Sequence, residues 1–247
     1  ELLNKLSQDA SVEYVLKDYL VVPYTQPNDP LFDSLWALHN TAQTYPLGGP
    51  GTRDSDIDYP EFLDIDASLE NITIAVLDSG VDYTHPDLVN NLWINYGELG
   101  GINGADDDNN GYIDDIYGYD FSEDDPDPSD DLGHGTHCAG IIAATPDNGV
   151  GISGVCPNCK IMSLKFFPAS TFTNAIAAIA YATANGAKVI SNSWGCNNGC
   201  AEYTPLEDAI SSAYDAGVLV IFAAGNDNND ISSNEVYYSP QSMSSEN

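Results

Sequence analysis

Basic residues are scarce in this sequence. It has 6 lysines and arginines against 38 aspartates and glutamates, so the formal net charge at pH 7 is −32. Such a charge repels the phosphates of nucleic acids and the anionic head groups of membranes through long-range Coulomb forces. We therefore expect neither nucleic acid nor a membrane to be a partner. The acidic composition fits either an ordinary exported protein or one adapted to high salt, and the sequence leaves both open.

Long apolar runs are also missing. The longest covers eight residues, from Ala175 to Ala182, whereas a helix needs about 20 apolar residues to cross a bilayer. We therefore expect no transmembrane helix. With 247 residues the chain is long enough to bury a large core, so we expect one main domain with a small appendage.

Cysteine is present but sparse, with five residues in all. Two pairs are close in sequence, Cys156 with Cys159 and Cys196 with Cys200, and Cys138 stands alone. In an exported protein each pair could close a small disulfide loop, or the pairs could cross-link. Four thiolates at these spacings could instead hold a structural zinc ion, although the spacing of the second pair is unusual for zinc. We favour disulfides and leave their connectivity open.

From residue 71 onward, short apolar runs alternate with helical patterns. This alternation is typical of an α/β fold, in which helices cover both faces of a mostly parallel sheet. The predicted strands are Ile72–Leu77, Lys160–Phe166, Lys188–Ser193 and Val218–Ala224, with a weaker one at Tyr117–Phe121. Functional groups of such folds gather at the carboxyl ends of the strands.

Two helices are expected between the later strands. The first covers Thr173–Ala184, and the second begins at Pro205 with Thr204 as its cap. The buried stripe of the second helix should comprise Leu206, Ile210, Ala213 and Tyr214.

A carboxylate stands where the first predicted strand ends. The run Ile74-Ala75-Val76-Leu77 leads directly into Asp78, and Gly80 permits a tight turn just after it. A partly desolvated carboxylate is costly unless a donor satisfies it, and an imidazole N–H would do so. Alone, Asp78 would more often be a simple turn residue.

A histidine motif supplies the expected donor. His134 and His137 lie within the run Gly133-His134-Gly135-Thr136-His137-Cys138-Ala139-Gly140, before an apolar helical stretch. We expect His134 to project from the first turn of that helix towards Asp78, and His137 to face elsewhere. Cys138 is best explained as a small packing residue.

A polar side chain also follows the last predicted strand. Asn226 ends the run Phe222-Ala223-Ala224-Gly225-Asn226, and its amide could donate a hydrogen bond to the negative charge that develops on a carbonyl oxygen during acyl transfer. Alone, this asparagine could equally be a turn residue.

Together these motifs resemble those of the subtilisin-like serine proteases. The similarity covers nearly the whole chain and rests on four stretches: Asp78-Ser79-Gly80-Val81-Asp82 with His85-Pro86-Asp87-Leu88, Gly133–Gly140, Ser193-Trp194-Gly195, and Ala223–Asn226. The resemblance implies a three-layer α/β fold with a mostly parallel central sheet, and secreted serine-type endopeptidase activity.

The resemblance also assigns roles to residues. By it, Asp78 orients His134, His134 is the general base and then the general acid, and Asn226 belongs to the oxyanion hole. By the resemblance, the backbone of an extended substrate would pair with the edge formed by Ser193, Trp194 and Gly195. The primary specificity pocket would be lined by Ala223, Ala224 and Gly225.

One element of the family pattern is missing from the sequence. No Gly-Thr-Ser-Met-Ala type segment follows Asn226, and Ser242-Met243 lacks the preceding Gly-Thr. We therefore expect the 247 residues to be the front part of a protease, inactive alone, whose C-terminal portion is absent. The alternative is a non-catalytic relative that binds calcium or peptides.

An acidic loop points to calcium. In the run from Asp106 to Asp115, oxygen ligands alternate and Gly111 allows a sharp bend, as in an EF-hand loop. The predicted ligands are Asp106, Asp108, Asn110, the Tyr112 carbonyl and Asp114. Position twelve is Tyr117, so no helix-loop-helix is expected. The resemblance implies a second, weaker calcium site at Asp87 with the turn at Asp147 and Asn148, and the acidic run Asp124–Asp131 could form a third.

The N-terminal residues differ in character from the rest. Residues 1–26 resemble the end of the inhibitory propeptide of the family, and residues 27–247 resemble its peptidase domain. The implied partners are peptide or protein substrates and the chain's own propeptide, and we expect a monomer.

Overall fold

The structure is a computed structural model of the chain. It describes residues 11–12, 14–15, 26–44, 48–64, 71–196, 203–226 and 240. Most of the predicted propeptide segment, residues 1–26, lies outside these residues.

A five-stranded parallel sheet forms the centre of the described chain. Its order is β2-β3-β1-β4-β5, and all four neighbouring pairs are parallel. The strands are β1 (Thr73–Asp78), β2 (Gly118–Asp120), β3 (Lys160–Lys165), β4 (Val189–Asn192) and β5 (Leu219–Phe222). Each predicted strand is present, and most bounds differ from the prediction by one or two residues. The predicted α/β fold is therefore confirmed.

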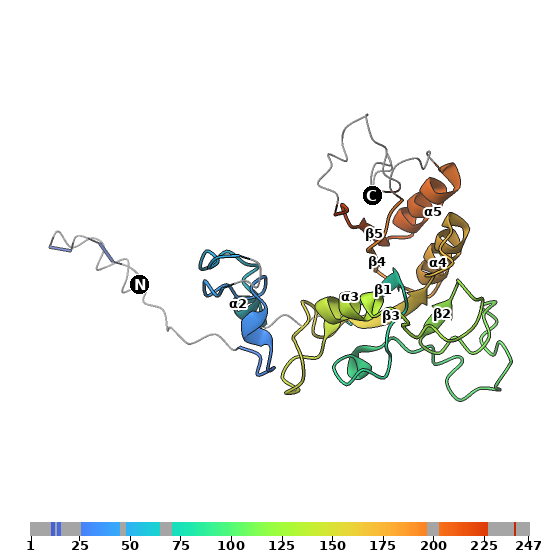
Figure 1. Cartoon of the computed structure of the whole chain (residues 1–247), viewed down its shortest axis with the longest axis horizontal. Helices are drawn as coiled ribbons and strands as arrows, with labels where there is room; N and C mark the ends of the chain where they lie inside the picture. The colour runs from blue at the N-terminus through green and yellow to red at the C-terminus, as the bar shows by residue number, and fades with distance from the viewer. Residues whose placement is uncertain are drawn as a thin grey trace.

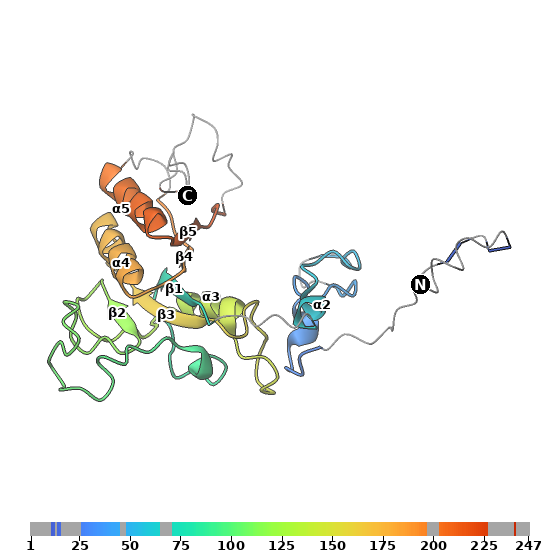
Figure 2. The ribbon, with the colours of Figure 1, turned by 180° about the vertical axis from the view of Figure 1, so that it is seen from behind.

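Helices lie on both faces of the sheet. The helices are α2 (Tyr59–Leu63), α3 (His134–Ala143), α4 (Phe172–Ala184) and α5 (Thr204–Asp215), with short 3₁₀ turns at Phe32–Ser34 and Val89–Asn91. Figures 1 and 2 show α4 and α5 side by side, with α3 running along β1 and β3 away from them. None of these helices is long and apolar enough to cross a membrane.

Alternation along β1 explains the three layers. Successive side chains of a strand point to opposite faces, so Ala75 and Leu77 pack in the core beneath α4 and α5. Ile74 and Val76 pack on the other face, in a smaller core with Ala139 and Ala143 of α3. Because both faces of β1 are covered, its sequence is apolar without interruption from Ile74 to Leu77.

The second predicted helix needs two corrections. Thr204 is the first residue of α5 and not its cap; the N-cap residue is Tyr203, whose side chain makes no capping hydrogen bond. Leu206 and Ile210 are buried as predicted, but Tyr214 is 53% exposed. At 100° per residue Tyr214 lies roughly 80° around the helix from Leu206, at the margin of the apolar stripe.

The last strand has one open face. Val220 of β5 is buried, whereas Leu219 and Ile221 are 45% and 46% exposed. These two side chains point to the face opposite Val220. Among the described residues, β5 is also an edge of the sheet.

Residues 26–44 and 48–64 form a small block beside the sheet, drawn in blue to cyan in Figure 1. Phe32, Leu38 and Tyr59 make its core. The Tyr59 hydroxyl donates a hydrogen bond to the Gly154 carbonyl at 2.8 Å, and the Leu31 N–H donates to Gly151 at 3.0 Å. The block is therefore attached to the loop that follows α3.

Candidate active site

Asp78 is the last residue of β1 and is only 1% exposed. Its Oδ1 atom accepts hydrogen bonds from the Ser79 N–H at 2.8 Å and from Nδ1 of His134 at 2.7 Å. A carboxylate held this way has a fixed orientation. The structure thus brings together the two side chains that the sequence placed 56 residues apart.

His134 is the first residue of α3, and its side chain is 56% exposed. An ionised carboxylate can only accept hydrogen bonds, so the neutral imidazole carries its proton on Nδ1. Nε2 is then free to accept a proton, as a general base requires. His137, one turn later, is exposed to solvent, unlike the buried Asp78.

Small residues allow this close approach of helix and strand. A Cβ atom built on Gly135 would lie 2.1 Å from the carbonyl oxygen of Gly80 and 3.1 Å from Cβ of Asp78. Gly80 itself has φ +99°, a conformation that side chains disfavour. The two glycines therefore let the start of α3 touch the end of β1.

The carboxyl ends of β4 and β5 lie on the same side of the sheet as Asp78, because all the strands run in one direction. Ser193 follows β4, and its Oγ lies 3.6 Å from Sγ of Cys138 on α3. Burial raises the pKa of the Cys138 thiol, and the charges of Asp78 and Asp130 add to the rise. Cys138 is consequently held as a thiol, which is a poor nucleophile.

The residues after β5 are open to solvent. Ala224, Gly225 and Asn226 are exposed, and the Ala223 N–H donates to the Asn192 carbonyl at 2.9 Å. Asn226 thus stands at the carboxyl edge of the sheet, two strands away from Asp78. Its predicted role, and those of Ala223, Ala224 and Gly225, stay predictions.

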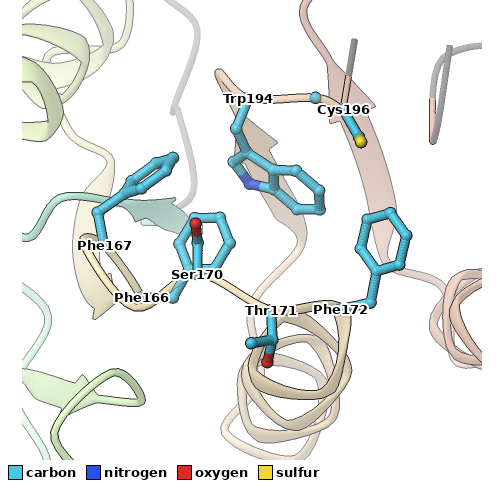
Figure 3. A pocket seen from close by; sticks show the side chains of 8 residues that line it. Phe166, Phe167, Ser170, Thr171, Phe172, Trp194 and Cys196 are labelled. Atoms are coloured by element: carbon cyan, nitrogen blue, oxygen red, sulfur yellow. The ribbon is translucent and has the colours of Figure 1, made fainter. Parts of the chain in front are cut away.

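An apolar cavity of about 350 Å³ opens beside the end of β4. Figure 3 shows the Trp194 ring in its middle, with Phe166 and Phe167 on one side and Phe172 on the other. The centroids of the Trp194 and Phe166 rings are 5.0 Å apart. The rest of the lining comprises Ser170, Thr171, Gly195 and Cys196. The sequence predicted Trp194 and Gly195 as substrate contacts but missed the phenylalanines, which come from the segment after β3.

Comparison with known proteins identifies the family. The family model described as Subtilase family (peptidase S8) matches residues 70–245. The chain belongs to the subtilase family. Within it, the chain is 34% identical over 227 residues to a thermophilic serine proteinase of Bacillus sp. (strain AK1), covering 90% of this chain and 48% of that protein.

Other subtilases agree. Thermitase of Thermoactinomyces vulgaris is 34% identical over 216 residues, which is 86% of this chain and 62% of thermitase. A solved protease of Pseudoalteromonas arctica matches with a TM-score of 0.63 at 24% identity, over 87% of this chain and 62% of that one, and supports the fold. The chain thus spans about half to two thirds of the length of these relatives.

A second polar centre lies in the acidic loop. One carboxylate oxygen each from Glu98, Asp108 and Asp115 lies within 4.8 Å of the others. Glu98 and Asp115 are 3% and 0% exposed. Burial raises the pKa of Asp115, although hydrogen bonds from Tyr181, Asn110 and Asn95 oppose the rise.

Of the five ligands predicted in this loop, only Asp108 belongs to that group. Both carboxylate oxygens of Asp106 accept backbone N–H groups of Asn110 and Gly111, and Asp114 accepts from Gly104. The oxygen of Asn110 accepts from the Tyr112 N–H. The sequence did not predict Glu98, because it precedes the loop by eight residues and the EF-hand spacing does not include it.

The second predicted calcium position is also assembled from distant segments. Asp87 is 2% exposed and accepts hydrogen bonds from Asn148 Nδ2 at 2.7 Å and the Ile152 N–H at 3.0 Å. Asp29, which the sequence did not single out here, accepts from the Asp147 N–H at 3.1 Å.

The cysteines are consistent with disulfides. The sulfur atoms of Cys156 and Cys159 are at bonding distance, with their Cα atoms 5.4 Å apart. Cys138 is free. Cys200 lies outside the described residues.

Proposed function

We propose that this chain supplies the aspartate and histidine of a serine endopeptidase. The observation that carries the proposal is the 2.7 Å hydrogen bond between Asp78 and His134 at the carboxyl edge of a subtilase sheet. Nε2 of His134 would take the proton of a serine hydroxyl as that oxygen attacks a peptide carbonyl, and later give it to the leaving amine. Asp78 would stabilise the imidazolium formed in between.

The oxyanion would be stabilised by Asn226. Its exposed position after β5 leaves the amide free to approach a substrate carbonyl. Loss of one such donor lowers kcat by about 10²–10³-fold in enzymes of this kind. The 247 residues contain no Gly-Thr-Ser segment after Asn226, so the proposal concerns a protein that has this segment in addition.

The substrate would be an extended peptide. Backbone groups of Ser193, Trp194 and Gly195 would pair with it as an added strand, which their place at the end of β4 allows. The cavity around Trp194 would take a large apolar side chain of the peptide, since aromatic rings line it. Apolar walls with few polar groups are typical of such sites.

Calcium would stabilise the fold. The fit rests on Glu98, Asp108 and Asp115, because they are three close oxygen donors of the kind that calcium prefers. Two buried carboxylates side by side repel each other unless a cation or a proton intervenes. An ion here would supply charge neutralisation and no step of the reaction. Asp87, with Asn148, is the second candidate.

The remaining expectations from the sequence are part of the proposal. Residues 1–26 would be the end of an inhibitory propeptide and residues 27–247 the peptidase domain, in a secreted and monomeric protein. The oxidised Cys156 and Cys159 pair supports an oxidising exterior.

The test uses the complete gene product. A fluorophosphonate should label one serine, and Asp78→Asn should lower kcat by about 10⁴-fold, the loss known for this role in serine proteases generally. His134→Ala should abolish labelling, and His137→Ala is the matched control. Activity that survives complete fluorophosphonate labelling would contradict the serine mechanism.

The second candidate is a non-catalytic subtilase relative that binds calcium or peptides. The carboxylate cluster of Glu98, Asp108 and Asp115 favours it, because calcium binding there needs no catalytic serine. A stop codon directly after Asn247 would support this candidate, and an in-frame Gly-Thr-Ser segment would support the enzyme.

A further inference from the structure

Asp130 links the two elements that carry Asp78 and His134. Its Oδ2 accepts the N–H of Thr136 at 2.9 Å and the hydroxyl of Thr136 at 2.6 Å. Its Oδ1 accepts the Ser79 hydroxyl at 2.8 Å, together with the N–H groups of Leu132 and Gly133 at 2.9 Å each. One carboxylate therefore receives five hydrogen bonds.

Two hydroxyls extend this arrangement from the helix to the strand. The Ser79 hydroxyl donates to Asp130 and accepts the N–H of Gly135 at 2.9 Å. The Thr136 hydroxyl donates to Asp130 and accepts the N–H of Asp82 at 2.9 Å. Ser79 and Asp82 lie on either side of the turn after Asp78, whereas Gly135 and Thr136 directly follow His134 in α3. Asp130 is thus connected to both sides of the Asp78–His134 contact.

The first turn of α3 depends on this carboxylate. Gly133, the N-cap residue, has no side chain to cap α3. The first N–H groups of the helix therefore need another acceptor. Burial alone would raise the pKa of Asp130, but the bonds from Thr136, Leu132 and Ser79 outweigh it and hold the pKa below its usual range. Asp130 is therefore ionised near neutral pH, and its bonds are charge-assisted.

We propose that Asp130 is a positioning residue for His134: through Ser79 and Thr136 it holds the start of α3 against the end of β1, so that Nδ1 of His134 stays on Asp78. The proposal rests on the proposed role of His134 as general base. The resemblance of the motifs assigns Asp130 no part in catalysis.

An asparagine cannot replace this carboxylate. Every group that faces the two oxygens of Asp130 is a donor, and three of the five are backbone N–H groups, which cannot turn away. In Asp130→Asn the NH₂ group of the new amide would point at one or two of them in either orientation. The Thr136 hydroxyl could turn to accept from the new amide, but the backbone N–H of Thr136 would still face a donor in that orientation. Asp130→Asn should therefore loosen the first turn of α3 without changing the size of the side chain.

The test follows the proton on Nδ1 of His134 by NMR, in the 247-residue chain labelled with ¹⁵N-histidine. His134→Gln assigns the signal among the four histidines. In the native chain Asp78 protects this proton from exchange with water. In Asp130→Asn we expect exchange to be about tenfold faster or more, since a bond to a charged group contributes at least that factor. The ¹⁵N shifts should also show a growing share of the Nε2–H tautomer.

Matched variants separate positioning from general stability. Asp127→Asn is the control, because Asp127 lies in the same loop and its side chain accepts hydrogen bonds from Tyr83 and Ser129 instead. Thr136→Val removes one hydroxyl at constant shape and should speed exchange. Thr136→Ser retains the hydroxyl and should restore the native rate.

The outcomes are distinct. A folded Asp130→Asn chain with the native exchange rate and tautomer overturns the proposal and makes Asp130 a helix cap only. If Asp130→Asn does not fold, Thr136→Val decides: a native rate overturns the proposal, and faster exchange that Thr136→Ser reverses supports it. Failure of the proposed function looks different, because the complete protein would then be inactive while the native Nδ1 proton stays protected.

Discussion

Gly135 offers the sharpest test of the contact between α3 and β1. In Gly135→Ala, the new methyl group would lie 2.1 Å from the Gly80 carbonyl oxygen, whereas ordinary contacts begin at 3.4 Å. The helix start must therefore move by about 1.3 Å, the difference between these two distances. The atom that the methyl group meets at 2.1 Å is a backbone oxygen, so no flexible side chain can yield.

The size of this displacement determines the expected losses of stability and activity. A shift of that size along the contact would lengthen the 2.7 Å bond between His134 and Asp78 to about 4 Å, which is no longer a hydrogen bond. Overpacking of this kind costs about 1–3 kcal/mol of stability. In the complete protein, a misplacement near 1 Å should lower kcat by about 10²-fold.

The control is the same substitution one and a half turns later. A Cβ on Gly140 meets only the Ile152 side chain, at 3.7 Å. Gly140→Ala should therefore raise the free energy of unfolding by about 0.5–1 kcal/mol, because alanine favours the helix. The two variants of α3 should thus change stability in opposite directions.

Urea denaturation followed by circular dichroism measures both free energies, and NMR reports the Nδ1 proton of His134. Gly135→Ala as stable as the native chain, with that proton still protected, would refute the close packing described here. So would equal losses in Gly135→Ala and Gly140→Ala, since the argument depends on what each methyl group meets.

Three further results are expected. Calcium at 100 times its dissociation constant should raise the free energy of unfolding by about 2.7 kcal/mol, and Asp108→Asn should weaken this effect in a thermal melt while Asp106→Asn changes it less. The pKa of Asp130 is lowered in the folded chain, so its carboxylate stabilises the fold above the ordinary pKa of 3.8 and loses this effect as pH falls through the folded value. The stability difference between the native chain and Asp130→Asn should therefore shrink as pH falls below 3.8. A difference that stays constant would contradict this. Replacing Cys156 and Cys159 by alanine opens a loop of sequence separation 3 and should cost about 2 kcal/mol in urea denaturation, whereas no loss would mean that the bond does not constrain the unfolded chain.

Part of the site could be predicted because the sequence pattern indicates where the strands end. Asp78 follows four apolar residues and precedes a turn, and His134 opens a helix among small residues. In a parallel sheet both positions lie at one edge, so their proximity followed from topology. The order of the five strands did not, because it depends on which faces of the strands pack together.

Other features depend on contacts that no local pattern contains. Glu98 belongs with Asp108 and Asp115 only because its buried carboxylate accepts the N–H groups of Asp107 and Asp108, at 2.8 Å and 3.0 Å. Phe167 and Phe172 line the cavity with Trp194 because the segment after β3 passes the end of β4. Tyr214 was misplaced since periodicity gives the centre of a buried stripe more reliably than its margin.

The open face of β5 has a consequence for how molecules of this polypeptide meet. Leu219 and Ile221 expose apolar side chains on one face of β5, the last strand of the sheet among the described residues, and exposed apolar side chains that lie together favour contact with another molecule. The net charge of −32 keeps copies apart in dilute buffer. Salt shortens the reach of that repulsion to about 10 Å at 0.1 M, so self-association should grow with ionic strength rather than diminish.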